Sequence, residues 1–325
     1  MPLSVDLGVD ELAATRFAMS PLAETVSGLQ LLGRGGRATR LRPWLRWARR
    51  EIERSGLQLP TAWPLLVQDR PTWPEFVAPS PTGPEPSVEA ELERMQQTRA
   101  AQVRTSLARV FGADLPAAVA EVARHPAAGL REIAAELQAA HDLLVAPHWP
   151  RLRAVLASDI AYRARQVAIG GTERLFADLH RDVTWQGGRL TLRRIGPPQT
   201  IILGERGLVL VPSVLMEDHV RVKLSTATQT TLRYPARGIA ELWTAGLHEP
   251  RGSAVQLLGR PRARLLEAMR APATTGGLAQ SLGVTPSAVS QHLAVLRDSG
   301  LVTSERTGRH VLHLVTDLGL ALLDP

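Results

Sequence analysis

The strongest constraint on folding lies in the last quarter of the chain, where two apolar patterns with helical spacing flank a short break. Leu278 and Leu282 lie four residues apart and predict the buried face of a short helix. Gly283 follows them and can take the left-handed backbone conformation that ends a helix. Thr285 can cap a second helix, with Pro286 at its first position. The segment therefore predicts two helices joined by a tight turn.

The second of these helices is predicted to have a buried stripe and an exposed polar face. Val289, Leu293 and Leu296 form the apolar stripe. The other positions carry compact hydrogen-bonding side chains, which can reach base edges in the major groove of DNA. The candidates for base reading are Ser287, Ser290, Gln291 and His292.

Two strand-like runs follow, at 301–306 and 310–315, and the residues 307–309 between them complete a predicted β-hairpin. Arginines in such a hairpin can touch phosphate or the minor groove. The candidate phosphate contacts are Thr275, Arg306, Thr307 and Arg309, while Arg297 is either phosphate-facing or simply exposed.

The run from Val289 to Val302, together with Arg306-Thr-Gly-Arg-His310, resembles the ArsR/SmtB-type winged-helix repressors. The resemblance covers residues 255–325 of the 325-residue chain. It implies a homodimer that binds two-fold symmetric operator DNA, often with release triggered by a ligand. A winged helix behind a long N-terminal region also resembles actinobacterial regulators of the ArsR-like type.

The chain departs from this family in two ways. It has no cysteine, so the cysteine-based metal motif of the family is absent. The usual C-terminal dimer helix is reduced to residues 316–325. We therefore expect no metal-sensing role, and we expect dimerisation to use the large N-terminal region.

Residues 1–170 are predicted to be mainly helical, with a possible dimerisation or sensor role. Between Arg34 and Arg54 there are eight arginines against two glutamates. This basic stretch either lies along DNA phosphates or forms an ordinary solvated helix face. Further along, 71–86 is a proline-rich loop, and a long helix is expected from Ser87 to about Phe111. More helices are predicted at roughly 116–124, 129–145 and 149–168.

The pattern changes after residue 170. A Gly-Gly turn flanked by alternating residues, from Trp185 to Leu192, indicates a hairpin. Short apolar or β-branched runs follow at 200–203, 207–215, 219–226 and 229–234, and a helix is expected near 236–246. The fold class is therefore α+β, in three parts: a mainly helical region (1–170), a small antiparallel sheet with a helix (171–250) and a C-terminal winged helix-turn-helix (255–325).

No enzyme motif is found. Gly-x-Ser-x-Gly is absent, and no Gly-Lys-Ser/Thr follows Gly33-Arg-Gly-Gly36. His310 and His313 lie three apart on a predicted strand, so they point to opposite faces and make a poor chelating pair. We expect no catalytic residue, no metal site and no cofactor. The N-terminal segment lacks the pattern of a secretory signal and no apolar run is long enough to span a membrane, which predicts a cytoplasmic, nucleoid-associated protein.

Four of the seven tryptophans lie close together in the sequence. They either line a pocket for an apolar small-molecule ligand in the N-terminal region or fill a core. These four residues are Trp44, Trp47, Trp63 and Trp73.

The function predicted from the sequence is sequence-specific transcription regulation, as a repressor that binds double-stranded DNA as a homodimer. The formal net charge of +7 supports this only weakly, because the arginine content of a GC-rich coding genome is the simpler explanation of the charge. Two alternatives remain: a winged helix that binds another protein as a scaffold, and a chromosome-binding protein with little sequence preference.

Overall fold

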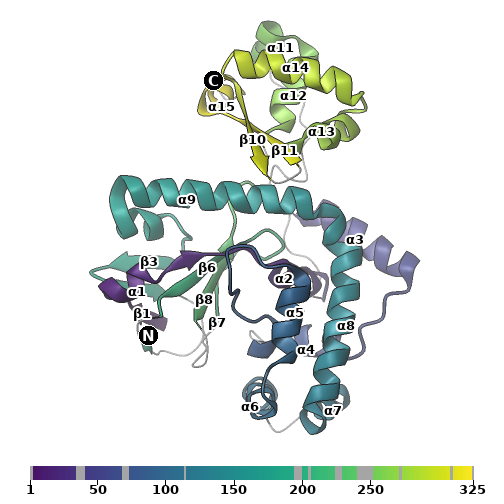
Figure 1. Ribbon diagram of the computed structural model, residues 1–325, viewed down its shortest axis with the longest axis vertical. Helices are drawn as coiled ribbons and strands as arrows, with labels where there is room; N and C mark the ends of the chain where they lie inside the picture. Colours follow the sequence, from purple (N-terminus) through teal and green to yellow (C-terminus); the bar gives the residue numbers. More distant parts are fainter. Residues whose placement is uncertain are drawn as a thin grey trace. The chain divides into compact units, whose positions relative to one another are not determined.

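A computed structural model shows two compact units (Figure 1). The first comprises Met1–Trp149 and Asp159–Ala236, and the second comprises Pro150–Ser158 and Arg237–Pro325. The structure describes residues 3–33, 41–67, 73–112, 115–193, 200–203, 206–223, 229–239, 252–270, 273–307 and 310–323.

Helices dominate the chain up to residue 177, which confirms the expected mainly helical region. Many begin at residues that suit a helix start: Ser87 accepts a hydrogen bond from the Ala90 amide (3.2 Å), and α8 begins at Pro126. The helices are α1 (Val9–Ala13), α2 (Pro21–Gly33), α3 (Arg42–Ser55), α4 (Ala62–Leu66), α5 (Val88–Gln96), α6 (Ala100–Phe111), α7 (Ala117–Arg124), α8 (Pro126–Leu144) and α9 (Trp149–Ala177), with 3₁₀ turns η2 (Glu75–Val77) and η3 (Ala146–His148).

The single helix expected from Ser87 to Phe111 is wrong, because the structure has two helices there. The break falls at Gln97–Arg99, and Arg99 has extended backbone angles (φ −62°, ψ 140°). No residue between Met95 and Val103 is buried. The packing of the apolar residues therefore does not require one continuous helix. The predicted cap at Ser87 is confirmed.

Two four-stranded sheets complete the first unit, and each takes a strand from the first 17 residues. One has the order β3-β4-β1-β5 and the other the order β2-β6-β8-β7. The strands are β1 (Leu3–Asp6), β2 (Arg16–Phe17), β3 (Val183–Gln186), β4 (Arg189–Leu192), β5 (Thr200–Ile202), β6 (Leu208–Ser213), β7 (Arg221–Lys223) and β8 (Thr230–Pro235).

The antiparallel sheet expected over 171–250 is present only in part. The β3–β4 hairpin is confirmed, with Gly187 and Gly188 at positive φ (56° and 81°), as a two-residue turn of this kind requires. Strand β6, however, is parallel to both β2 and β8. All six residues of β6 are buried, and a continuous apolar strand is typical of parallel pairing with both faces covered.

The buried carboxylate of Glu24 joins α2 to the segment after β6. It accepts hydrogen bonds from the amides of Val214 (2.8 Å) and Leu215 (2.7 Å). The guanidinium of Arg233 on β8, also buried, donates to the Ala23 carbonyl (3.3 Å). These bonds satisfy backbone groups that would otherwise be buried without partners, and they join residues about 190 positions apart.

Glu91 on α5 fixes the start of α2 in a similar way. Its carboxylate accepts hydrogen bonds from the Ser20 hydroxyl (2.6 Å) and the Leu22 amide (3.0 Å). Burial raises the pKa of Glu91 to about 7, although these two hydrogen bonds act in the opposite direction. The helix α2 that these contacts fix is itself buried along nearly its whole length.

The second unit contains the elements predicted for a winged helix. Leu265, Leu266 and Met269 are buried in its core, as expected. The helix predicted near 236–246 falls largely outside the described residues. The elements are α11 (Gly252–Leu258), α12 (Arg260–Ala268), β9 (Ala273–Thr274), α13 (Thr275–Leu282), α14 (Pro286–Asp298), β10 (Val302–Thr307), β11 (His310–Val315) and α15 (Asp317–Leu323).

Within the described part of the chain, no helix is both long enough and apolar enough to cross a lipid bilayer.

A Glu91→Gln variant tests the buried carboxylate. Because the pKa of Glu91 is higher in the folded protein than in an unfolded chain, its stabilising contribution is present below pH 4.5 and is lost as the pH rises through about 7. We expect the free energy of unfolding of the wild type, relative to the variant, to fall by on the order of 2–3 kcal/mol between pH 4.5 and pH 8. Urea unfolding across this range measures it, and a pH-independent difference would contradict the assignment.

Candidate nucleic-acid interface

Helices α13 and α14 are held at a fixed turn by backbone conformation and by two caps. The Thr274 hydroxyl accepts a hydrogen bond from the Gly277 amide (3.1 Å) at the start of α13. Gly283 ends that helix in the left-handed conformation (φ 66°), and the Thr285 hydroxyl accepts from the Ala288 amide (3.3 Å) to start α14. The predicted stop and second cap are confirmed, whereas the cap at Thr274 was missed in the sequence.

The apolar stripe of α14 is buried as predicted, and this orients the rest of the helix. Val289, Leu293 and Leu296 are at most 2% exposed. Ser287, Ser290 and Gln291 are exposed on the remaining surface of the helix, and His292, at the edge of the stripe, is half-buried. The Ser290 hydroxyl donates to the Pro286 carbonyl (2.9 Å), which leaves the lone pairs of its oxygen to accept from another partner. Arg297 is also exposed, near the C-terminal end of the helix.

The structure adds two apolar residues to this surface. Val284, in the turn, is 46% exposed, and Val295, on α14, is 40% exposed. Apolar side chains of this size can contact the methyl group of thymine in a major groove. No sequence pattern separates these two residues from the buried valines nearby, because exposure depends on how α14 packs.

The predicted wing is present as strands β10 and β11. They pair antiparallel from Val302 opposite Val315 to Thr307 opposite His310, and β9 extends the sheet on the other side of β11. Residues 308–309, and hence Arg309, lie outside the described part of the chain, as do the side chains of Arg306 and Thr307.

A buried histidine links the wing to the helix-turn-helix. His313 on β11 is 4% exposed, and its Nε2 lies 2.9 Å from the Thr275 hydroxyl oxygen on α13. Its Nδ1 lies 2.8 Å from the Ser304 hydroxyl oxygen on β10. The structure thus places Thr275, a predicted phosphate contact, against His313. A single histidine on a strand carries no such signal in the sequence.

The fold and these surface features agree with a family match. Residues 262–304 match the model described as "Bacterial regulatory protein, arsR family". The C-terminal module is an ArsR-family helix-turn-helix. The resemblance inferred from Val289–Val302 is therefore confirmed, and the module is of a kind found in DNA-binding transcriptional regulators.

Two individual proteins are similar to the same module. The HTH-type transcriptional regulator NmtR of Mycobacterium tuberculosis is 38% identical over 73 residues, which are 22% of this chain and 61% of that protein. The chain thus matches less than two thirds of that relative's length. A solved structure described as "Possible transcriptional regulator for arsenical resistance" is 32% identical, covers 22% of this chain and 77% of its own, and has a TM-score of 0.20.

A different match covers much of the rest of the chain. Residues 82–240 match a family of unknown function (DUF5937). This second family names no activity for the first unit.

The tryptophans of the first unit have separate environments. Trp44 is fully buried, and its indole nitrogen donates to the Leu144 carbonyl (3.3 Å). Trp47 meets His148 edge to face, with ring centroids 4.3 Å apart. The Trp73 ring lies beneath two guanidinium groups, with the Cζ atoms of Arg221 and Arg233 at 4.9 Å and 4.7 Å from the ring centroid. Trp63 is half-buried. Trp44 thus has the contacts of a core residue.

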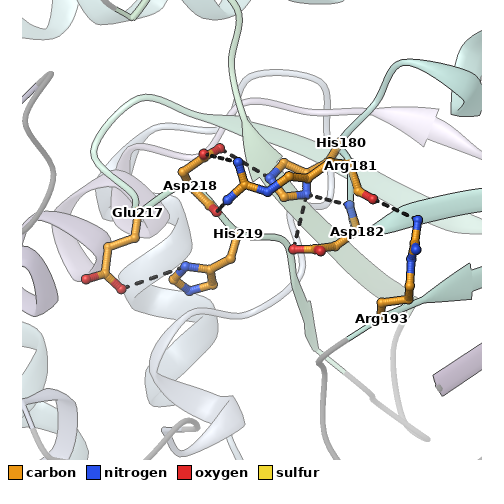
Figure 2. A network of polar contacts seen from close by, with 7 residues as sticks. All are labelled: His180, Arg181, Asp182, Arg193, Glu217, Asp218 and His219. Atoms are coloured by element: carbon orange, nitrogen blue, oxygen red, sulfur yellow. Dashed lines mark hydrogen bonds and ion pairs between the residues drawn. The ribbon is translucent and has the colours of Figure 1, made fainter. Parts of the chain in front are cut away.

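Figure 2 shows a network of polar contacts that joins the segment after α9 to the segment before β7. His180 lies at its centre: its Nε2 is 3.2 Å from an Asp218 carboxylate oxygen, and its Nδ1 accepts from the Asp182 amide (3.1 Å). Arg181 donates to the other Asp218 oxygen (2.8 Å). Partial burial acts to raise the pKa of Asp218, but the hydrogen bonds from His180 and Arg181 and the positive charge of Arg181 outweigh it and lower the pKa. The network holds two loops together.

A His313→Ala variant tests the link between the wing and α13. We expect the second unit to lose about 1–3 kcal/mol of stability at neutral pH, because two partly buried hydroxyl groups lose their partner. Burial lowers the pKa of His313, and nearby Arg297 lowers it further. The contribution is therefore complete above pH 6.5 and is lost as the pH falls through the lowered value.

Denaturant unfolding at about pH 7.5 and about pH 5 measures this loss. The matched control is His292→Ala, a half-buried histidine on α14 of the same unit, for which a smaller change is expected. Equal losses in the two variants would contradict the assigned role.

Proposed function

We propose that this protein is a sequence-specific DNA-binding transcriptional regulator that acts as a homodimeric repressor. One observation carries the proposal: a capped helix of an ArsR-family module buries its apolar stripe and leaves its hydrogen-bonding side chains exposed. Such a helix suits the major groove, where each base pair presents a distinct set of donors and acceptors.

Within this proposal, each group has a task. Ser287, Ser290, Gln291 and His292 read base edges. Arg297, together with Arg306, Thr307 and Arg309 of the wing, contacts phosphate or the minor groove. Thr275 contributes by holding His313, and its position at the start of α13 also suits a phosphate contact through the helix amides. No group here has a role in catalysis.

Base reading is tested by selection of sheared genomic DNA with the purified full chain, followed by sequencing. The test variant is Gln291→Ala/His292→Ala, and the matched control is Gln256→Ala, an exposed glutamine on α11 of the same unit. We expect the wild type and the control to enrich one inverted-repeat motif. We expect the test variant to lose on the order of 1–3 kcal/mol of discrimination at each base pair that it no longer reads.

Two results would overturn base reading by α14. Equal recovery of DNA without a motif by all three proteins would indicate a non-specific chromosome-binding protein. A lack of recovery at physiological salt would favour a module that binds another protein.

The homodimer in this proposal has a surface that the structure supports. Leu257 on α11 is 72% exposed and Leu318 on α15 is 60% exposed, and these two helices contact each other. Large apolar side chains exposed on two helices that contact each other favour association. The N-terminal region, which the sequence pointed to, is the alternative surface.

A Leu257→Glu/Leu318→Glu variant is therefore expected to sediment as a monomer at concentrations where the wild type is a dimer, because charge is costly in an apolar interface. The matched control, Val9→Glu/Ile169→Glu, places the same charges on two exposed apolar positions of the first unit (84% and 63% exposed). Dissociation by the control alone would move the dimer interface to the N-terminal region.

A further inference from the structure

Helix α3 has two chemically distinct faces. Trp44, Leu45 and Ala48 are at most 3% exposed and attach the helix to the first unit. The side that faces solvent carries four exposed arginines at spacings that place them along one strip of the helix. These residues, the α3 arginine strip, are Arg42, Arg46, Arg49 and Arg50.

The four arginines of the strip do not stabilise the helix through interactions with one another. Arg46 lies four residues from Arg42 and from Arg50 and three from Arg49, and like charges at these spacings destabilise a helix. No acidic residue occurs three or four positions from Arg42 or Arg46 in the sequence. Arg42 also lies in the first turn, where the helix dipole disfavours a positive charge.

The acidic residues of α3 come only at its C-terminal end. Glu51 there forms an ion pair with Arg54. Exposed Glu53 lies four residues from Arg49 and three from Arg50, so acidic side chains can balance the strip only at that end. A stabilising design would interleave acidic and basic side chains along the helix. An external polyanion, which neutralises all four charges together, accounts for the strip better.

We propose that the α3 arginine strip binds the phosphate backbone of double-stranded DNA without reading its sequence. This rests on the proposed function, because it adds a second contact to the same partner. From Arg42 to Arg50 the helix rises about 12 Å, a length that faces several phosphates of a duplex with a charge about every 3.4 Å along each strand. Guanidinium groups bind phosphate oxygens through two parallel hydrogen bonds.

Two further observations favour DNA. The segment 255–325 carries seven arginines against five acidic residues, a net charge of only +2, so its own attraction to phosphate is modest. A basic amphipathic helix can also bind an anionic membrane surface, but it does so by inserting its apolar face. In α3 that face is already buried in the protein.

The test measures affinity for a random-sequence duplex of about 40 base pairs, as a function of salt, with the full chain. A random sequence removes the contribution of base reading. In the test variant, Arg42→Gln/Arg46→Gln/Arg49→Gln/Arg50→Gln, we expect the slope of log affinity against log salt to become shallower by about 2–4, because each phosphate that is no longer neutralised changes the slope by about 0.9. A variant with lysine at the same four positions keeps the charge and is expected to retain most of the slope.

The matched control removes the same charge elsewhere in the first unit, by Arg99→Gln/Arg124→Gln/Arg131→Gln/Arg165→Gln at exposed positions. We expect its slope to equal that of the wild type. Melting temperatures of all variants show whether the fold is retained. An unchanged slope in the test variant, or the same change in the control, would overturn the proposal, as would a wild type that fails to bind the duplex at low salt.

These outcomes are separate from the test of base reading. Absence of an inverted-repeat motif for the wild type, together with a shallower slope in the test variant, would leave the strip as a DNA contact in a protein without sequence preference. A clear motif for the wild type, together with an unchanged slope in the test variant, would reject the strip alone.

Discussion

The first unit depends on backbone hydrogen bonds between residues almost two hundred positions apart. Strand β1 pairs with β4 on one side and β5 on the other, and β2 pairs with β6. The carboxylate of Glu24 then accepts from the amides of Val214 and Leu215. Closing so long a loop carries an entropic cost, which the buried core between the sheets and helices has to offset. The central helices and the later strands therefore form a single unit.

The second unit depends mainly on interactions between residues that are close in the sequence. Its turn is fixed by a left-handed glycine and a threonine cap, and the stripe of α14 sets which residues face outward. His313 adds one contact that crosses from the wing to α13. A surface that reads DNA has to hold its side chains in a fixed arrangement, because each base contact depends on the direction of a hydrogen bond. The module satisfies this condition with few residues.

Local signals in the sequence were enough to predict much of this second unit. Gly283, Thr285 and Pro286 each have a preference that acts within a few residues, and the structure confirms all three. The partnership of His313 with Thr275 could not be predicted, because the two residues lie 38 positions apart and meet only when β11 packs beside α13. The break between α5 and α6 was missed for a related reason: either one helix or two would satisfy the local preferences, and packing decides.

By itself, the sequence determined the helix-turn-helix, the wing and the β3–β4 hairpin, since capping residues, glycine turns and apolar spacing act locally. It also supplied the arginines of α3, although only burial of Trp44 and Leu45 showed that four of them share the solvent side. Tertiary structure alone decided the parallel pairing of β6, the insertion of β1 between β4 and β5, and the buried positions of Glu24, Glu91 and Arg233. These features depend on which distant segments of the chain pack together. A charged side chain is buried only where those segments bring hydrogen-bonding partners to it.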